Sequence, residues 1–377
     1  MGWKRTVGVA LAGALLLSRV MWPVERAHLQ AFAVLRLVSG QQVPAVVDVL
    51  VRKPVVTRVV TFEANGQTIR ARSYMPAKDS NAPALVVLHG VHHLGMDEPR
   101  LMAFASAMAS CGMRVLTPEL PGIKDYRVSP DSVRVIGEAA NWFAMQTGGP
   151  VAVMGLSFSG GLALVAASEE QYRRSIRFVF AVGSQDAMEH VSEYYLTGRA
   201  VRPDGTVQLL PAHEYGPLVL EYEHLEDYVP ARDATAVRAV LREHLYEDKK
   251  AEAVARATLN ARQTSEAAKL MDASSPQTRA RLREVNLRYA EEMRALSPHG
   301  RLGTMTVPVF LLHGQADNII PAAETLWMAS ELPERSLQAM LISPVLSHLD
   351  MDGAKPGAMD QWRLLHFFAL VIRASVN

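Results

Sequence analysis

One short stretch constrains the fold of this chain more than any other: residues 150–167 read PVAVMGLSFSGGLALVAA. The short apolar run 151–154 is typical of a buried strand, and the run 162–167 is rich in the helix formers Ala and Leu. Ser157 stands between them among very small residues. A strand–turn–helix of this kind holds its serine in a strained conformation, lifts the hydroxyl out of the sheet and puts the backbone N–H of Phe158 beside it.

The same stretch resembles a known nucleophile motif, with one departure. Residues 155–159, Gly-Leu-Ser-Phe-Ser, resemble the Gly-x-Ser-x-Gly elbow of the α/β-hydrolase family, but Ser159 replaces the last glycine. Two serines are therefore candidates for the nucleophile. We favour Ser157, because that choice keeps Gly155 at the tightest point behind the nucleophile; Ser159, in Ser-x-Ser-x-Gly, is the alternative. Serine adds only a hydroxymethyl group, so we expect the elbow to form.

Length and composition place the chain among globular proteins. Its 377 residues, 49% of them hydrophobic and 20% charged, suffice for one large α/β domain or for a core domain with an insertion. The 39 basic and 38 acidic residues nearly cancel, which argues against a nucleic-acid partner. The single cysteine, Cys111, excludes an intrachain disulfide and a cysteine-based zinc site.

The N-terminus has the layout of a secretory signal. Lys4 and Arg5 precede an uncharged stretch that ends before Arg19. This stretch alone would span about 20 Å as a helix, less than a hydrocarbon core of about 30 Å, but an extension with Arg19 snorkelling approaches a full span. We therefore expect an uncleaved signal-anchor, with residues 6–24 as a membrane tether and the protein membrane-anchored or exported. A cleaved signal and an ordinary helix are the alternatives.

Alternating strands and helices predict an α/β fold, a mostly parallel sheet with helices on both faces. The sheet is expected to begin with an antiparallel hairpin over residues 55–75, because Asn65-Gly66 is typical of a type I′ turn. The further strands are expected at 82–88, 114–117, 151–155, 176–182, 307–312 and 337–342. The helices between and after them are expected at 99–113, 130–147, 162–168, 322–332 and 361–375.

The alternation is interrupted once, between about residues 185 and 303, where strand patterns cease and charge density rises. The resemblance implies a helical cap at this place, since α/β-hydrolases commonly carry one after the strand that corresponds to 176–182. A separate helical domain is the alternative, but the alternation resumes immediately afterwards. The domains expected are an N-terminal anchor and linker (1–50), a first part of the hydrolase core (51–184), the cap insertion (185–303) and a second part of the core (304–377).

Nucleophilic catalysis by serine needs a base, and a neutral imidazole needs a third group that fixes its tautomer. The resemblance implies the order nucleophile, acid, histidine, each after a strand. The chain offers Ser157, Asp317 and His348 in that order. Asp317 lies in His-Gly-Gln-Ala-Asp-Asn-Ile-Ile-Pro, which resembles the acid-loop pattern of the family, and His313 in the same stretch is expected to hold the loop. Asp186 is the rival acid.

An oxyanion hole needs two backbone N–H donors. Phe158 offers one, and the resemblance to a His-Gly-x motif assigns the other to Val91, with His92 as second choice. We expect His89 to hydrogen-bond the loop, and His92 and His93 to line the substrate entrance. A metal site at these histidines is disfavoured because no carboxylate stands at ligand spacing, so neither a metal nor a cofactor is expected.

Together these features predict a serine hydrolase that cleaves an ester or related acyl bond through an acyl-enzyme. Ser157 would attack, His348 would act as base and then acid, and Asp317 would orient the imidazole. A cap that encloses the site favours a small or medium acyl substrate. Two alternatives stay open: an acyltransferase with the same triad, and a noncatalytic, membrane-tethered binding protein of the same fold.

Overall fold

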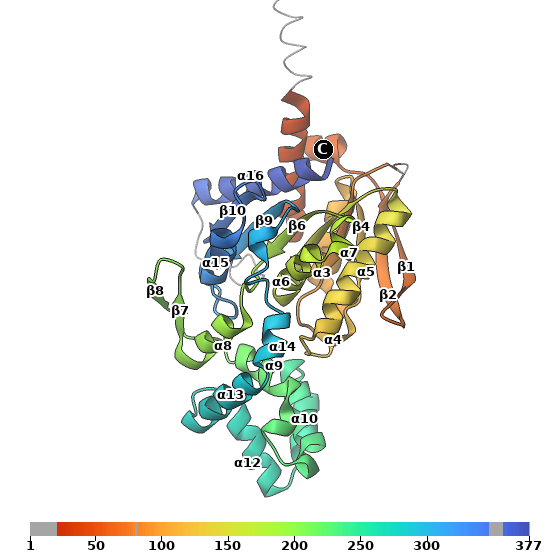
Figure 1. The fold of residues 1–377 in the computed structure, drawn as a ribbon. Helices are drawn as coiled ribbons and strands as arrows, with labels where there is room; N and C mark the ends of the chain where they lie inside the picture. The colour runs from red at the N-terminus through yellow and green to blue at the C-terminus, as the bar shows by residue number, and fades with distance from the viewer. Residues whose placement is uncertain (1–20, 78, 80, 347–356, 377) are drawn as a thin grey trace, which may run out of the picture.

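The computed structural model of the chain (Figure 1) describes all residues except 1–20, 78, 80, 347–356 and 377. At its centre is an eight-stranded sheet with the order β1-β2-β4-β3-β5-β6-β9-β10. The strands are β1 (Val55–Ala64), β2 (Gln67–Pro76), β3 (Ala84–Leu88), β4 (Arg114–Pro118), β5 (Val151–Leu156), β6 (Ile176–Val182), β9 (Val309–Gly314) and β10 (Leu337–Ser343). From β4 to β10 the neighbouring strands are parallel, whereas β1 and β2 pair antiparallel. The predicted α/β fold class is confirmed.

The antiparallel start of the sheet follows from its turn. Ala64 pairs with Gln67, so Asn65 and Gly66 alone form the connection between β1 and β2. Their φ angles are 52° and 72°. Positive φ at both central residues defines the type I′ turn, whose twist matches the twist of paired strands. The predicted hairpin is therefore confirmed.

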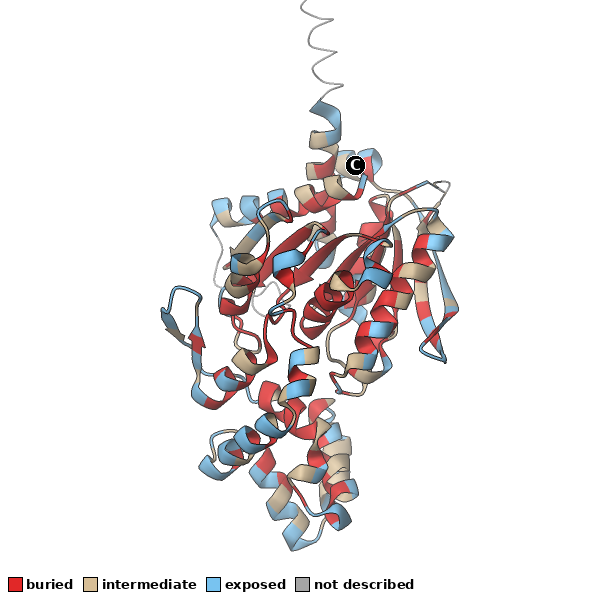
Figure 2. Ribbon diagram, in the orientation of Figure 1, coloured by how far each residue is buried: buried red, intermediate tan, exposed pale blue. Residues whose placement is uncertain are grey.

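Helices cover both faces of the sheet, which lies between two apolar clusters. The first cluster includes α5 (Pro130–Thr147), α6 (Phe158–Ser168) and α15 (Ala323–Glu331); the second includes α3 (Pro99–Ser110), α16 (Ala358–Val376) and a helix over residues 21–38. Figure 2 shows the central strands almost entirely buried, and all five residues of β3 are buried. Burial on both faces explains why these strands are continuous apolar runs in the sequence.

Between β6 and β9 the chain forms a group of helices that we call the helical lobe, residues 188–295. It consists of α8 (Met188–Thr197), α9 (Tyr215–Glu223), α10 (Ala231–Leu245), α11 (Lys249–Ala257), α12 (Ala261–Leu270), α13 (Pro276–Arg288) and α14 (Ala290–Ala295). α10, α12 and α13 gather at the end opposite α16 (Figure 1). The lobe also holds a two-stranded sheet, β7 (Arg199–Val201) and β8 (Val207–Leu209), which is too short to produce a sequence signal. The proposed domain boundaries stay a prediction.

The prediction of a signal-anchor and a membrane location requires a correction. Within the described residues, no helix is both long enough and apolar enough to cross a membrane. Residues 6–20 of the predicted tether lie outside the described residues. Its other residues, 21–24, belong to the helix over residues 21–38. Ala31 and Val34 of this helix are fully buried in the same apolar cluster as α16. The apolar face of this helix is thus covered by protein, an outcome that hydropathy alone does not distinguish from burial in lipid.

This packing makes a prediction about stability. Val34→Ala should lower the free energy of unfolding by about 1–3 kcal/mol, because it removes buried methyl groups. The matched control is Val46→Ala in α2 (Ala45–Val51), where the side chain is 72% exposed and the change should stay within about 0.5 kcal/mol. Urea unfolding followed by circular dichroism measures both. Equal, small effects would show that the helix does not pack as described.

Candidate active site

Ser157 occupies a strained turn between β5 and α6. Its φ of 56° and ψ of −136° lie in a region that side-chain-bearing residues rarely adopt. Phe158 is the first residue of α6, so its N–H is one of the backbone donors that an α-helix leaves unpaired at its N-terminus. The sequence predicts such a turn at this serine, and the structure has one there.

The turn depends on direct contact between the backbones of β5 and α6. A Cβ added to Gly155 would lie 2.4 Å from Cα of Gly160. A Cβ added to Gly160 would lie 2.0 Å from Oγ of Ser184 and 2.8 Å from the carbonyl oxygen of Gly155. In the Gly-x-Ser-x-Gly motif the last glycine lets the helix backbone approach the strand. Here that position is Ser159, and the residue in closest contact with Gly155 of the strand is the next one, Gly160.

Ser159, the rival nucleophile, is engaged elsewhere. It lies in the first turn of α6, is fully buried, and its Oγ donates a 2.6 Å hydrogen bond to the carbonyl oxygen of His89. Its hydroxyl therefore ties the elbow helix to the loop that follows β3. This contact gives a reason for serine at the motif position where the family has glycine.

The loop after β3 is held through three consecutive carbonyl groups, each by a different side chain. The His89 carbonyl accepts from Ser159, as above; the Gly90 carbonyl accepts from Nδ1 of His89 at 2.8 Å; the Val91 carbonyl accepts from Oη of Tyr215 at 2.9 Å. In a trans peptide, the N–H of the next residue points opposite to the carbonyl. The three bonds therefore set the orientation of three successive N–H groups, including that of Val91.

The tautomer of His89 follows from its two partners. Nε2 accepts a 2.9 Å hydrogen bond from the N–H of Leu120, so Nδ1 must carry the proton that it donates to the Gly90 carbonyl. Burial lowers the pKa of His89 to about 4, which keeps the ring neutral near pH 7. Both ring nitrogens are occupied, which argues against a metal site here.

The elbow, the predicted oxyanion loop and the helical lobe meet around one cavity of about 470 Å³. The core contributes Ser157, Phe158, Val91 and His92, and the lobe contributes Tyr215 and Tyr246 among others. His93, expected at the entrance, is not among the lining residues: its ring stacks on Tyr246 and on His92, with centroids 4.3 and 4.7 Å apart. A second, more apolar cavity of about 160 Å³ shares Val91 and His92 but not Ser157.

Asp317 follows β9 in a loop that its own side chain organises. Asp317 is 1% exposed, and its Oδ1 accepts hydrogen bonds from the N–H groups of Ile319 and Ile320, both at 2.9 Å. His313 donates from Nε2 to the Ile320 carbonyl at 2.8 Å, which matches the structural role expected for it. His348, the predicted base, lies outside the described residues.

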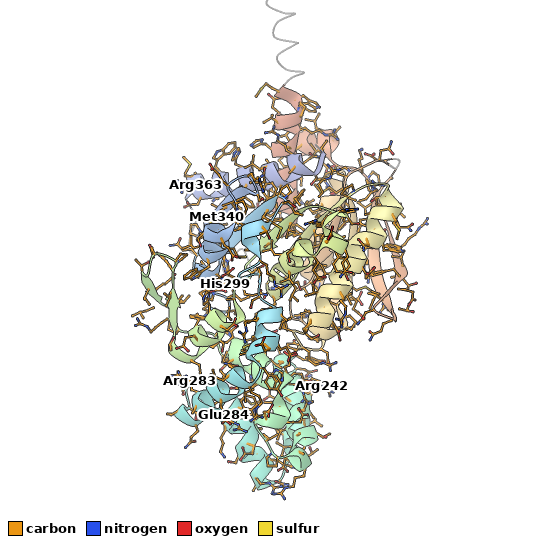
Figure 3. All side chains as sticks on the ribbon, in the orientation of Figure 1. Arg242, Arg283, Glu284, His299, Met340 and Arg363 are labelled. Atoms are coloured by element: carbon orange, nitrogen blue, oxygen red, sulfur yellow. The ribbon has the colours of Figure 1, made fainter. Side chains whose placement is uncertain are left out.

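Asp186, the rival acid, has a different environment. Its Oδ2 lies 2.8 Å from Nδ1 of His299, near the junction of the sheet and the lobe (Figure 3), and it does not line the cavity with Ser157. Burial raises the pKa of Asp186 to about 7. Asp186, His299 and Glu331 could together hold a metal ion. However, both oxygens of Glu331 accept backbone N–H groups, from Gly300 and Leu302, which explains Glu331 without a metal.

Sequence reasoning missed the contribution of the lobe to the cavity. Tyr215 and Tyr246 stand in helical segments without any motif, and their positions relative to Ser157 depend on how the lobe packs. Tyr126 was also missed; it lines the same cavity, and its φ of 59° could not be read from its neighbours.

The fold and the turn that carries Ser157 define the class of protein. A mostly parallel sheet with helices on both faces, a strained serine between a central strand and its helix, and an acidic loop after a later strand are the features of an α/β-hydrolase. Residues 108–348 match the family described as X-Pro dipeptidyl-peptidase (S15 family). This match spans more than half of the chain, and the chain therefore belongs to that family, whose members are hydrolases of the serine-hydrolase type.

Solved structures similar to this chain include esterases and a peptidase. An esterase from Pyrobaculum calidifontis is 17% identical, with 93% of this chain and 92% of that chain covered and a TM-score of 0.46. Brefeldin A esterase, a bacterial homologue of human hormone-sensitive lipase, is 17% identical, with 96% and 87% covered and a TM-score of 0.46. Pyrococcus horikoshii acylaminoacyl peptidase is 13% identical, with 77% of this chain and 37% of that chain covered and a TM-score of 0.43. This chain thus spans little more than a third of that protein. A search of curated proteins gave no match.

The neutral state of His89 makes a prediction about pH. The second ring proton of His89 binds to the folded protein only near pH 4, whereas it binds to the unfolded chain near pH 6.5. The stabilisation from His89 is therefore present above pH 6.5 and is lost as the pH falls to about 4. The difference in unfolding free energy between the wild type and His89→Ala should therefore shrink by about 3 kcal/mol between pH 7.5 and 4.

Urea titrations at a series of pH values measure this difference. Leu88→Ala, the control, removes a fully buried neighbour in β3 that carries no titratable group, so its effect should not depend on pH. A pH-independent effect of His89→Ala would contradict the neutral, buried histidine.

Proposed function

We propose that this chain hydrolyses a carboxylic acyl bond through an acyl-enzyme, with Ser157 as nucleophile, His348 as base and acid, and Asp317 as the group that orients the imidazole. The observation that carries the proposal is the position of Ser157. It stands at a φ of 56° at the start of α6 and lines a cavity of about 470 Å³ together with the predicted oxyanion loop. Strained backbone at a serine that faces a cavity is a feature of nucleophile elbows.

The chemistry follows from these positions. The Ser157 hydroxyl attacks the carbonyl carbon as His348 accepts its proton, and the tetrahedral oxyanion is stabilised by the N–H groups of Phe158 and Val91. The positive end of the α6 dipole adds to this stabilisation at Phe158. His348 then protonates the leaving group, and water hydrolyses the acyl-enzyme by the same route in reverse. The proposal requires neither a metal nor a cofactor.

Two substrate classes are candidates. A small or medium ester fits a cavity that the lobe partly encloses, with Tyr215 and Tyr246 among its lining residues. A peptide bond after proline is the second candidate, favoured by the family to which the chain belongs. Both substrates pass through the same acyl-enzyme and differ in leaving group and pocket contacts. Transfer of the acyl group to an alcohol or thiol would use the same residues, and product analysis with an added alcohol would detect it.

The nucleophile assignment predicts the site of covalent labelling. A fluorophosphonate should label Ser157 in the wild type, as read by peptide mass mapping, and Ser157→Ala should lose both labelling and hydrolysis. Removing the nucleophile of a serine hydrolase lowers kcat by a factor on the order of 10⁶. Ser159→Ala is the matched control, in which the label should remain on Ser157. Labelling of Ser159, or activity retained in Ser157→Ala, would refute the assignment.

The substrate class predicts a chain-length limit. We expect p-nitrophenyl esters to be hydrolysed up to a length at which kcat/KM falls, since each methylene that no longer fits costs about 1–3 kcal/mol. Xaa-Pro p-nitroanilides, measured alongside, test the second candidate. Turnover of these anilides with no turnover of any ester would replace the ester proposal with the peptidase one.

A further inference from the structure

One hydrogen bond of the predicted oxyanion loop comes from the helical lobe. Tyr215 is the first residue of α9, and its hydroxyl donates to the carbonyl oxygen of Val91 at 2.9 Å, across 124 residues of sequence. The Val91 side chain also packs against the apolar cluster of the lobe. The other two bonds to this loop, from Ser159 and His89, come from the hydrolase core. Tyr215 therefore provides a direct polar connection between this loop and the lobe.

Contacts with Tyr126 hold the side chain of Tyr215 in place. Its ring packs edge-on against Tyr126, with centroids 6.1 Å apart. Tyr126 in turn donates from its hydroxyl to the carbonyl oxygen of Leu245 at the end of α10, at 2.9 Å. Two lobe helices, α9 and α10, thus hold the pair of tyrosines, and the hydroxyl of Tyr215 reaches the loop from a fixed position.

The same short segment also contacts the loop that carries the predicted acid. The N–H of His213 donates to the carbonyl oxygen of Asn318, the residue after Asp317, at 2.9 Å. Nδ1 of His213 then accepts from the N–H of Tyr215 at 3.2 Å. Residues 213–215 therefore connect the acid loop on one side with Val91 on the other.

We propose that Tyr215 is a positioning residue for the oxyanion donor, through which the docked helical lobe sets the geometry of the catalytic site. This inference rests on the proposed function. The N–H of Val91 belongs to the peptide unit just before the one whose carbonyl Tyr215 holds, and the two units share the Cα of Val91. The carbonyl of Val91 shares its peptide unit with the N–H of His92, the second-choice donor, so removing the hydroxyl frees that N–H directly. The N–H of Val91 is still held by His89 through the Gly90 carbonyl, and it loses only the support of the adjoining peptide unit at the Cα of Val91. A donor that must reorient during the reaction stabilises the oxyanion less.

The test is Tyr215→Phe, which removes one hydroxyl and keeps the ring. For the p-nitrophenyl ester that the wild type hydrolyses best, kcat should fall about tenfold and KM should change by less than about twofold. The reason is that the N–H donors of this loop bind the oxyanion, which is present in the transition state and not in the bound substrate. A trifluoromethyl ketone, whose adduct with the serine hydroxyl carries the same oxyanion, should lose affinity by about the same factor as kcat.

The matched control is Tyr228→Phe. Its hydroxyl is also in the lobe and is buried, but it has no hydrogen-bond partner among the described residues. Tyr228→Phe should keep the wild-type kcat, and thermal unfolding of both variants tests whether they remain folded. An unchanged kcat in Tyr215→Phe overturns the proposal, as does a rise in KM alone or a loss of kcat without a parallel loss of ketone affinity.

Ser157→Ala separates this proposal from the proposed function. If Ser157→Ala retains hydrolysis, the proposed function fails and the role of Tyr215 fails with it. If Ser157→Ala is inactive while Tyr215→Phe is as fast as the wild type, the serine hydrolase stands and only the role of Tyr215 is lost.

Discussion

The contact between Gly155 in β5 and Gly160 in α6 is the constraint on which the candidate site depends. Strand and helix touch through backbone atoms, with no room for a Cβ on either glycine. This contact forces the residue between them, Ser157, to a positive φ and starts α6 at Phe158. It also brings Ser159 within hydrogen-bond reach of the loop after β3. One steric restriction thus places the proposed nucleophile, one proposed oxyanion donor and one anchor of the opposite loop.

In the loop after β3, hydrogen bonds from buried side chains fix the orientation of the backbone. Each of three successive carbonyls accepts from a side chain, and His89 contributes twice, as an acceptor from Leu120 and as a donor to Gly90. Buried polar groups almost always need partners, so such a network leaves the backbone few alternative conformations. Because burial keeps His89 uncharged, it can serve as both donor and acceptor near pH 7.

The central strands β3, β5, β6 and β9 were predicted well because they are buried on both faces and read as continuous apolar runs. The range predicted for β6, 176–182, is the range observed. α6 was predicted to begin at residue 162 but begins at 158, since Gly160 and Gly161 have low helix propensity and the first turn forms through its contact with β5. The N-terminal prediction was wrong for a different reason: a basic start followed by an uncharged stretch suggested a membrane tether, but no described helix is long and apolar enough to cross a membrane.

The sequence by itself determined the turn at Ser157, because that turn depends on residues close together in the chain, from Gly155 to Gly161. The triad of Ser157, Asp317 and His348 was inferred from the order of three motifs and stays a prediction. His348 lies outside the described residues, so its place in the site stays a prediction. Only the tertiary structure decided which groups hold the loop after β3. Ser159 reaches His89 across 70 residues and Tyr215 reaches Val91 across 124. Such contacts depend on how whole elements pack, and no local pattern of residues specifies that arrangement.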